Sequence, residues 1–287
     1  MKIIVHRAGY TYIKDEGREI PGENTIKNAA LSLKQKKTDG IEIDLQYTKD
    51  LEPVVIHRNI KSLTLNDFRK RYPNNNSLKE WIEWYSESVS NTELVMYIDV
   101  KKDRRINDKK VINNFINTFL GFNKKIIIGS TDKEFLKLLS KERQGSEVPF
   151  KIFYMIPETF FPIQSIKKVA KEFTVEGNKQ IDGVHFFFID SVWKEILSII
   201  FKRGDFVTFT DFFRKRNWRN KRRIPIPNLY LFQDLYYLKT KIFVSTARKE
   251  GFLVMGASTG SLNSLEKMRD MGCDYLMVNV AEDAEFL

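Results

Sequence analysis

The stretch Lys125-Ile126-Ile127-Ile128-Gly129 is apolar at three consecutive positions, all of them β-branched. A strand with apolar side chains on both faces is typical of a parallel sheet that is covered on both sides. A closed barrel and a doubly wound sheet both bury a strand in this way. The stretch therefore predicts an α/β fold and leaves the choice between these two architectures open.

Outward from this stretch, β-rich runs alternate with amphipathic segments. Seven further strands are predicted at residues 3–6, 40–47, 94–101, 149–156, 183–188, 252–257 and 275–279. Helices are predicted at residues 25–37, 78–88, 106–120, 132–143, 164–173, 192–202, 234–250 and 261–271. The chain is thus a βαβα series with eight strands and no internal repeat.

The bulk properties suit one enzyme-sized domain over residues 1–287. The chain has 42% hydrophobic and 30% charged residues, and (β/α)₈ barrels use about 250 residues as one unit. Its net charge of +11 attracts anionic partners without choosing among them. A single cysteine, Cys273, excludes an intramolecular disulfide and a cysteine-based zinc site, and we expect a cytoplasmic protein.

One segment interrupts the series, at about residues 204–228 between the sixth and seventh predicted strands. It is rich in Lys and Arg interleaved with Phe and Trp. Such a segment suits a phospholipid surface, a polyanionic glycan or single-stranded nucleic acid, and a solvated basic loop is the alternative. Anionic membrane or glycan contact is the prediction kept, with nucleic acid set aside, and a lid over the active site is the expected form.

Two carboxylates, Glu42 and Asp44, lie two residues apart in the predicted strand 40–47. Side chains at this spacing leave the same face of a strand. Two buried carboxylates are costly unless a cation or a proton compensates them, and Mg²⁺ and Ca²⁺ prefer oxygen ligands. The pair predicts a site for a divalent cation, with a solvated edge strand as the alternative.

The predicted strand 94–101 repeats this spacing with Asp99 and Lys101. Asp99 could complete a metal site with three carboxylates. Lys101 could bind a phosphate, and a salt bridge to Asp44 or Glu42 is the competing explanation.

Only three histidines are present, and His6 and His57 each end a strand-like apolar run. In (β/α)₈ barrels the carboxyl ends of the strands carry the chemistry, and histidine transfers protons near neutral pH. We therefore expect both to be catalytic. His185 lies inside the predicted strand 183–188, and we expect it to be structural.

Six segments together resemble the glycerophosphodiester phosphodiesterase family in order and spacing. They are His6-Arg7-Ala8-Gly9, Gly22-Glu23-Asn24-Thr25, the run from Gly40 to Asp50, Pro53-Val54-Val55-Ile56-His57, the run from Tyr97 to Lys101, and the run from Gly272 to Asn279. The resemblance spans the chain and is most specific before residue 60. It implies a (β/α)₈ TIM-type barrel, here with the insertion between strands 6 and 7.

The resemblance also implies roles for these residues. Glu42, Asp44 and Asp99 would bind one divalent cation, Mg²⁺ or Ca²⁺. His6 and His57 would act as general acid and base.

Four further residues receive supporting roles from the resemblance. Arg7 and Lys101 would contact the substrate phosphate. Glu23 and Asn24 would brace the site from the loop after the first strand. Asn24 or Thr25 is also a good helix N-cap, so part of this motif has a structural explanation.

The chain departs from the family pattern at several positions. Asp99 stands in place of Glu, Leu51 in place of Gly, Arg58 in place of Asp, and Asn279 in place of Asp. Asp99 is one methylene shorter, and Asp here is similar to sphingomyelinase D-type phospholipases. Arg58 beside His57 is expected to lower the pKa of that histidine. The residues 255–259 replace the aromatic motif usual on the seventh strand.

The sequence thus predicts a metal-dependent phosphoric diester hydrolase that cleaves a glycerophosphodiester or a similar small phosphodiester with two histidines. Two alternatives stay open. One is a sphingomyelinase D-like phospholipase or lyase that forms a cyclic phosphate. The other is a non-catalytic polyanion-binding protein on the same scaffold.

Overall fold

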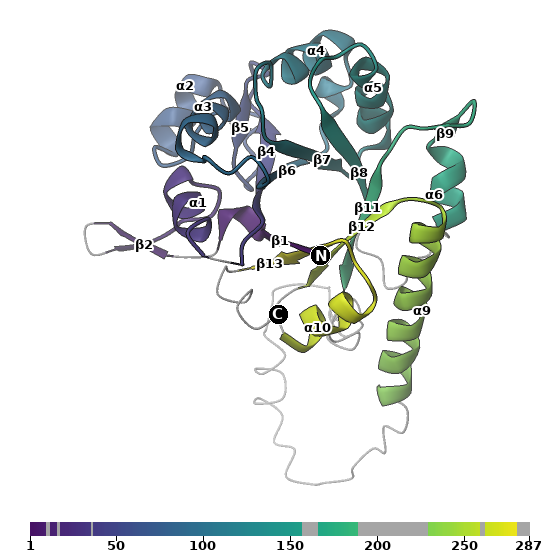
Figure 1. The fold of residues 1–287 in the computed structure, drawn as a ribbon. Coiled ribbons are helices and arrows are strands. Elements are labelled where there is room, and N and C mark those ends of the chain that lie inside the picture. The colour runs from purple at the N-terminus through teal and green to yellow at the C-terminus, as the bar shows by residue number, and fades with distance from the viewer. Residues whose placement is uncertain are drawn as a thin grey trace, which may run out of the picture.

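The computed structural model describes residues 1–9, 12–15, 18–35, 37–156, 166–188, 229–258 and 262–279. Within these residues, eight parallel strands form a sheet that closes on itself (Figure 1). They are β1 (Lys2–Val5), β4 (Gly40–Tyr47), β6 (Val95–Val100), β7 (Lys125–Ser130), β8 (Phe150–Met155), β11 (Gly183–Phe188), β12 (Leu253–Ser258) and β13 (Tyr275–Val278). All eight predicted strands are confirmed, and their ends shift by no more than one residue.

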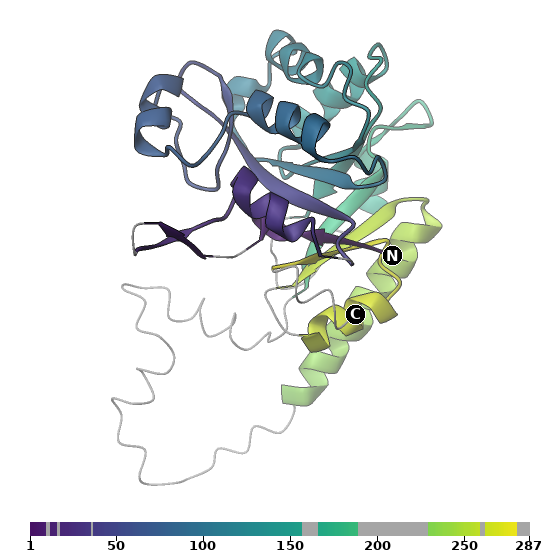
Figure 2. The same ribbon diagram turned by 60° about the vertical axis from the view of Figure 1, so that its left-hand side comes forward.

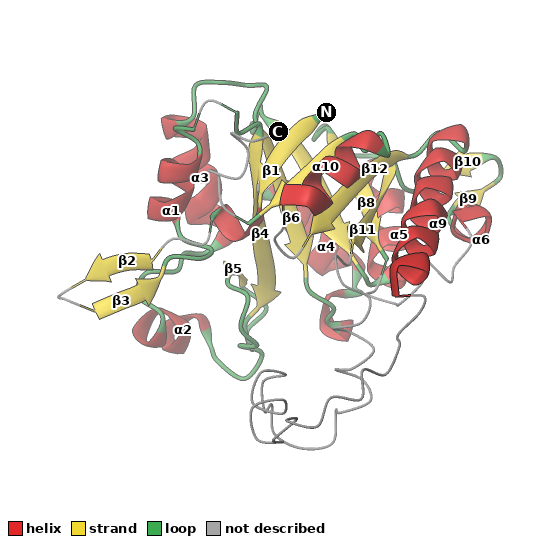
Figure 3. Cartoon of the chain, turned by 90° about the horizontal axis from the view of Figure 1, so that it is seen from below, coloured by secondary structure: helices red, strands yellow, loops and turns green. Residues whose placement is uncertain are grey.

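The barrel closes at β1, which pairs in parallel with the last strand and with β4. Lys2 lies opposite Tyr275 on one side, and Val5 lies opposite Ile41 on the other. This closure decides for a (β/α)₈ barrel and against a doubly wound sheet. Because the strands are parallel, their carboxyl ends meet at one end of the barrel, as the arrowheads in Figure 3 show.

Helices cover the outside of the barrel. They include α1 (Ile26–Ser32), α3 (Leu78–Ser88), α4 (Lys109–Asn117), α5 (Lys133–Arg143), α6 (Ile166–Glu172), α9 (Leu229–Lys249) and α10 (Leu262–Asp270). Ser77 begins α3 with a capping box that includes Glu80, and Asp132 caps α5. The start of α4 was predicted three residues too early, because Asp108 caps it after a 3₁₀ turn at Arg104–Ile106.

Two apolar layers follow from the alternation of side chains along each strand. One layer packs between the strands and the surrounding helices and includes Ile43, Ile98 and Ile128. The other fills the barrel interior and includes Tyr97 and Phe153. The interior is therefore a packed core up to the level where the polar side chains begin.

The strand-like run before His57 is β5 (Pro53–Val55), which runs antiparallel to β4. Three other short elements escaped prediction: helix α2 (Leu65–Arg71) and the hairpins β2–β3 (Tyr12–Asp15, Arg18–Pro21) and β9–β10 (Thr174–Val175, Asn178–Lys179). The β2–β3 hairpin protrudes beside α1 (Figures 1 and 2). Each element is too short to show a hydrophobic period of its own.

Two sequence predictions lie outside the described residues: the helix at 192–202 and the insertion at 204–228. Of the helices that the structure describes, none has the length and apolar character needed to cross a membrane.

Candidate active site

The three predicted ligand carboxylates converge at the carboxyl ends of two neighbouring strands. Glu42 and Asp44 leave the same face of β4, and Asp99 on β6 lies opposite Asp44 in the strand register. One carboxylate oxygen from each lies within 4.8 Å of the others. Asp99 therefore reaches the cluster although it is shorter than the usual Glu.

Burial makes this cluster electrostatically unfavourable when it is fully ionised. Glu42, Asp44 and Asp99 are only 1%, 0% and 6% exposed. Burial and the neighbouring carboxylates raise the pKa of Glu42 well above its usual range. Burial also raises the pKa of Asp99 to about 6, despite Lys101. Three close carboxylate oxygens whose full ionisation is unfavourable fit a hard divalent cation.

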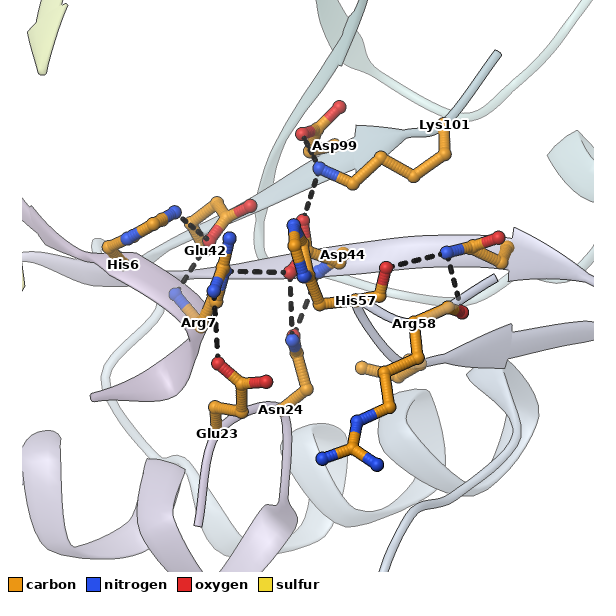
Figure 4. A network of polar contacts seen from close by, with 12 residues as sticks. His6, Arg7, Glu23, Asn24, Glu42, Asp44, His57, Arg58, Asp99 and Lys101 are labelled. Atoms are coloured by element: carbon orange, nitrogen blue, oxygen red, sulfur yellow. Dashed lines mark hydrogen bonds and ion pairs between the residues drawn. The ribbon is translucent and has the colours of Figure 1, made fainter. Parts of the chain in front are cut away.

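Lys101 supplies part of the missing positive charge, because its ammonium group ion-pairs with both Asp44 and Asp99 (Figure 4). Burial opposes ionisation of Asp44, but Lys101, Arg7 and Asn24 outweigh it and lower the pKa of this carboxyl. The salt bridge between Lys101 and Asp44 that the sequence suggested is therefore present. The second carboxylate that Lys101 contacts is Asp99 and not Glu42. The same ammonium group lies where it can contact a phosphate bound at these carboxylates.

Arg7 lies in a strained turn directly after β1. Arg7 and Ala8 have positive φ angles of 50° and 59°, which side chains with a Cβ rarely adopt. Side chains of α1 hold this turn, since Asn28 donates to the Gly9 carbonyl and Ser32 Oγ donates to the Ala8 carbonyl at 2.8 Å. Strain of this kind is concentrated at functional sites.

The turn brings Arg7 into contact with three acidic side chains. Its backbone N–H donates to Glu42 Oε2 at 2.6 Å, its Nη1 donates to Glu23 Oε2 at 3.0 Å, and its Nε lies 3.2 Å from Asp44 Oδ2. The guanidinium group is thus fixed beside the carboxylates.

Asn24 and Thr25 have separate roles, because Thr25 is the helix N-cap and Asn24 supports the site. Thr25 caps α1, and its side chain accepts from the Asn28 N–H. Asn24 binds Asp44 twice, because its Nδ2 donates to Asp44 Oδ2 at 2.8 Å and its Oδ1 accepts from the Asp44 N–H at 2.9 Å. Asn75 Nδ2 in turn donates to the Asn24 carbonyl at 3.1 Å.

His6 lies next to Glu42, at the start of the turn. Its Nε2 is 3.9 Å from Glu42 Oε2, and its Nδ1 is 3.3 Å from Asn279 Oδ1, a residue 273 positions away. Burial, followed by Arg7, lowers the pKa of His6 to about 4. Asn279 was noticed in the sequence only as a departure from the family, and the sequence carries no signal that it contacts His6.

His57 follows β5 and lies on the Asp44 side of the cluster (Figure 4). Gln46 Nε2 donates to the carbonyls of His57 and Arg58, at 2.8 and 2.7 Å. Gln46 was not predicted as a site residue, although its spacing from Asp44 puts it on the same face of β4.

The pKa of His57 is lowered, as expected, but Arg58 is not its main cause. The pKa is lowered, first by partial burial and then by Arg7 and Lys101, which outweigh Asp44 and Glu23. Arg58 is not among the main causes, and its guanidinium group points away from the cluster (Figure 4).

The assembled site offers a carboxylate cluster, two cationic side chains and two imidazoles at one end of the barrel. All nine residues predicted for the site lie in or beside this cluster: His6, Arg7, Glu23, Asn24, Glu42, Asp44, His57, Asp99 and Lys101 (Figure 4). Such an arrangement can neutralise an anionic phosphate and move protons on either side of it.

Solved structures with the same fold include several glycerophosphodiester phosphodiesterases. The enzyme from Parabacteroides distasonis is 15% identical with a TM-score of 0.60, covering 99% of this chain and 94% of the other. That from Thermotoga maritima is 15% identical with a TM-score of 0.57, covering 98% and 95%. A phosphodiesterase from Oleispira antarctica, solved with the product sn-glycerol-3-phosphate, is 13% identical with a TM-score of 0.63, covering 99% and 95%.

No curated protein sequence matches this chain. The sequence profile described as the Glycerophosphoryl diester phosphodiesterase family matches residues 6–155, which is just over half of the chain. The matched segment contains all nine predicted site residues and ends before His185 and Asn279. The chain therefore belongs to the glycerophosphoryl diester phosphodiesterase family and is a phosphoric diester hydrolase.

Proposed function

We propose that this enzyme hydrolyses a glycerophosphodiester, or a similar small phosphodiester, with one bound divalent cation, Mg²⁺ or Ca²⁺. The observation that carries the proposal is the convergence of Glu42, Asp44 and Asp99 within 4.8 Å beside Arg7 and Lys101. Family membership and the Oleispira antarctica phosphodiesterase with bound sn-glycerol-3-phosphate support this substrate class.

Glu42, Asp44 and Asp99 would hold the cation. When bound, it would supply positive charge to a non-bridging phosphate oxygen and lower the pKa of a coordinated hydroxyl. The side chains of Arg7 and Lys101 bind and orient the phosphate, since both of them contact Asp44. Glu23 and Asn24 keep the guanidinium group of Arg7 and the carboxylate of Asp44 in position.

His6 and His57 transfer the protons. With Nδ1–H donating to Asn279, neutral His6 presents the lone pair of Nε2 and acts as the base toward the attacking hydroxyl. The ring of His57 is only partly desolvated and reaches solvent, so it takes up a proton from water despite its lowered pKa and then acts as the acid toward the leaving alkoxide.

The test is incubation of the protein with glycerophosphodiesters, lysophospholipids and glycan phosphodiesters, with Mg²⁺, Ca²⁺ or a chelator, followed by phosphorus NMR. Release of glycerol phosphate that stops with the chelator supports the proposal. A cyclic phosphate as the end product would instead support the sphingomyelinase D-like alternative, since it requires internal attack by an adjacent hydroxyl. No turnover of any diester with any cation would overturn both.

Matched variants test the two histidines. His6→Ala and His57→Ala should each lower the rate about 10² to 10⁴-fold, the range for loss of a general acid or base. Arg58→Ala is the control, because Arg58 is the chain neighbour of His57 and points away from the carboxylates (Figure 4). Full activity of either histidine variant would remove that residue from the mechanism.

We further propose, from sequence alone, that the basic and aromatic segment at 204–228 helps to select the substrate through an anionic membrane or glycan. Its Lys and Arg residues supply charge, and its Phe and Trp residues supply apolar contact. Deletion of residues 212–223 should weaken binding to anionic vesicles or to a polyanionic glycan and spare turnover of a small soluble diester. Equal loss with every substrate would contradict a selective role.

A further inference from the structure

His185 lies inside the barrel, and the catalytic scheme above leaves it without a role. It is 1% exposed and sits on β11, on the opposite side of the barrel from β4. The strand register, with its stagger around the barrel, puts Met277, His185, Gly129 and Glu42 into one layer of four interior side chains. His185 therefore faces Glu42 across the barrel axis.

The next layer toward the carboxyl ends contains His6 and Asp99, by the same register. Burial lowers the pKa of His185 to about 3, and His6 and Lys101 add to this lowering, in keeping with a position below both side chains. His185 thus forms part of the floor beneath the carboxylates and the two cationic side chains.

Tyr97 fixes the ring of His185 from the layer below. The hydroxyl of Tyr97 lies 3.0 Å from His185 Nδ1, and the two rings meet edge to face at 5.5 Å. Gly129 makes room for this contact, because a Cβ at that position would lie 1.9 Å from the Tyr97 hydroxyl. Phe187 packs on the imidazole at 5.0 Å.

The second ring nitrogen, Nε2, is buried and has no hydrogen-bonding partner among the described residues. If the Tyr97 hydroxyl donates to Nδ1, Nε2 carries the hydrogen and is the one unsatisfied donor. The opposite tautomer leaves both the Tyr97 hydroxyl hydrogen and the Nε2 lone pair unsatisfied, so the first is favoured. A buried donor without an acceptor destabilises the free protein.

We propose that His185 is a substrate-binding residue. Its Nε2–H donates a hydrogen bond to an oxygen of the phosphate group that binds on the opposite side of the barrel, beside Glu42. A phosphate oxygen accepts hydrogen bonds, so it can satisfy the buried Nε2–H of His185. It does so only while substrate or product is bound. The proposal rests on the proposed function, because the phosphodiester substrate brings this phosphate to the site.

The double variant Tyr97→Phe/His185→Phe tests the proposal. Replacing both partners of a buried hydrogen bond by apolar rings of similar shape, and removing the unsatisfied donor, should leave the melting temperature unchanged or raise it. Binding of sn-glycerol-3-phosphate in the presence of Mg²⁺ should weaken about tenfold or more, as for a lost hydrogen bond to a charged group.

Tyr85→Phe is the matched control, because the Tyr85 hydroxyl on α3 is also buried and has no hydrogen-bonding partner in the described part of the chain. It should resemble the double variant in stability and bind sn-glycerol-3-phosphate like the wild type. Unchanged binding by the double variant would overturn the proposal.

A second measurement uses the wild-type protein, so it does not depend on whether a variant folds. The chain contains three histidines, so the ring nitrogens can be followed by NMR in ¹⁵N-labelled wild-type protein. Saturation with sn-glycerol-3-phosphate should shift the Nε2–H signal of His185 and protect it from exchange. Saturation without a change in this signal would overturn the role of His185 alone, whereas failure of the wild type to cleave any diester would overturn the proposed function.

Discussion

The two halves of the barrel contribute differently to the site. The half that begins with β1, β4 and β6 carries the carboxylates and the two cationic side chains of the site, which lie between Arg7 and Lys101 in the sequence. The half formed by β8, β11, β12 and β13 contributes, among the described residues, the neutral groups of His185 and Asn279. Opposite charges that must lie within hydrogen-bonding distance are placed on adjacent strands. The second half instead supplies single neutral contacts, such as the one by which Asn279 orients His6.

The largest expected effect tests the charged half. Asp44→Asn removes the carboxylate that Arg7, Asn24 and Lys101 all contact, and should lower the rate about a thousandfold, at the upper end for one preorganised electrostatic group. Phosphorus NMR measures the rate, and calorimetry measures the affinity for Mg²⁺.

Asp103→Asn is the control for this change, because Asp103 is buried and pairs with Arg105 outside the site. It should lower the melting temperature and leave the rate within a few-fold of wild type. Equal rates for the two variants would contradict the division between the halves.

The next effect tests whether the neutral half matters. Asn279→Leu removes the partner of His6 Nδ1 and should lower the rate about tenfold to a hundredfold through misorientation of the ring. Asn279→Asp retains an acceptor, so it should recover most of the rate. Its negative charge should also raise the pKa of His6 and move the acid limb of the pH–rate profile upward. A pH profile that stays in place would show that Asn279 does not act through His6.

A smaller effect comes from the pH dependence of stability without a divalent cation. Folding raises the pKa of Asp99 from 3.8 to about 6, so between these pH values the folded state holds a proton that the unfolded state has lost. This carboxyl therefore makes the protein less stable as the pH rises through this interval, by up to about 3 kcal/mol.

Asp99→Asn should remove this loss, so its stability relative to wild type should increase from pH 4 to pH 7 in the presence of a chelator. Saturating Mg²⁺ should reverse the order by stabilising only the wild type. Asp50→Asn is a control of opposite sign, because hydrogen bonding to Thr48 lowers the pKa of Asp50. Chemical unfolding at each pH measures the difference.

The smallest effect concerns Leu51, where the family commonly has Gly. Leu51 has a φ angle of 62°, in the left-handed region, which disfavours residues with a Cβ. Leu51→Gly should therefore be more stable than Leu51→Ala by about 1 kcal/mol, since Ala keeps the Cβ. Thermal unfolding compares the two, and a more stable Ala variant would exclude backbone strain at this turn.

Much of the fold could be predicted from the sequence, because it depends on local regularities. Uninterrupted apolar runs such as Ile126-Ile127-Ile128 identified the strands, and apolar residues three to four positions apart identified helices such as the one at 132–143. The spacing of Glu42 and Asp44 is by itself enough to place both carboxylates on one face of the strand. Closure into a barrel depended on β1 pairing with both β4 and β13, a long-range contact that no local pattern reports.

Only the tertiary structure decided which polar groups meet. His6 contacts Asn279 at the far end of the chain, Gln46 holds the carbonyl of His57, and Tyr97 orients His185 across the barrel. The direction of Arg58 also had to be seen, since adjacency in sequence does not fix where a long side chain points. Periodicity gives the face that a side chain occupies, whereas its partners depend on strand register, barrel stagger and burial, which exist only in the folded chain.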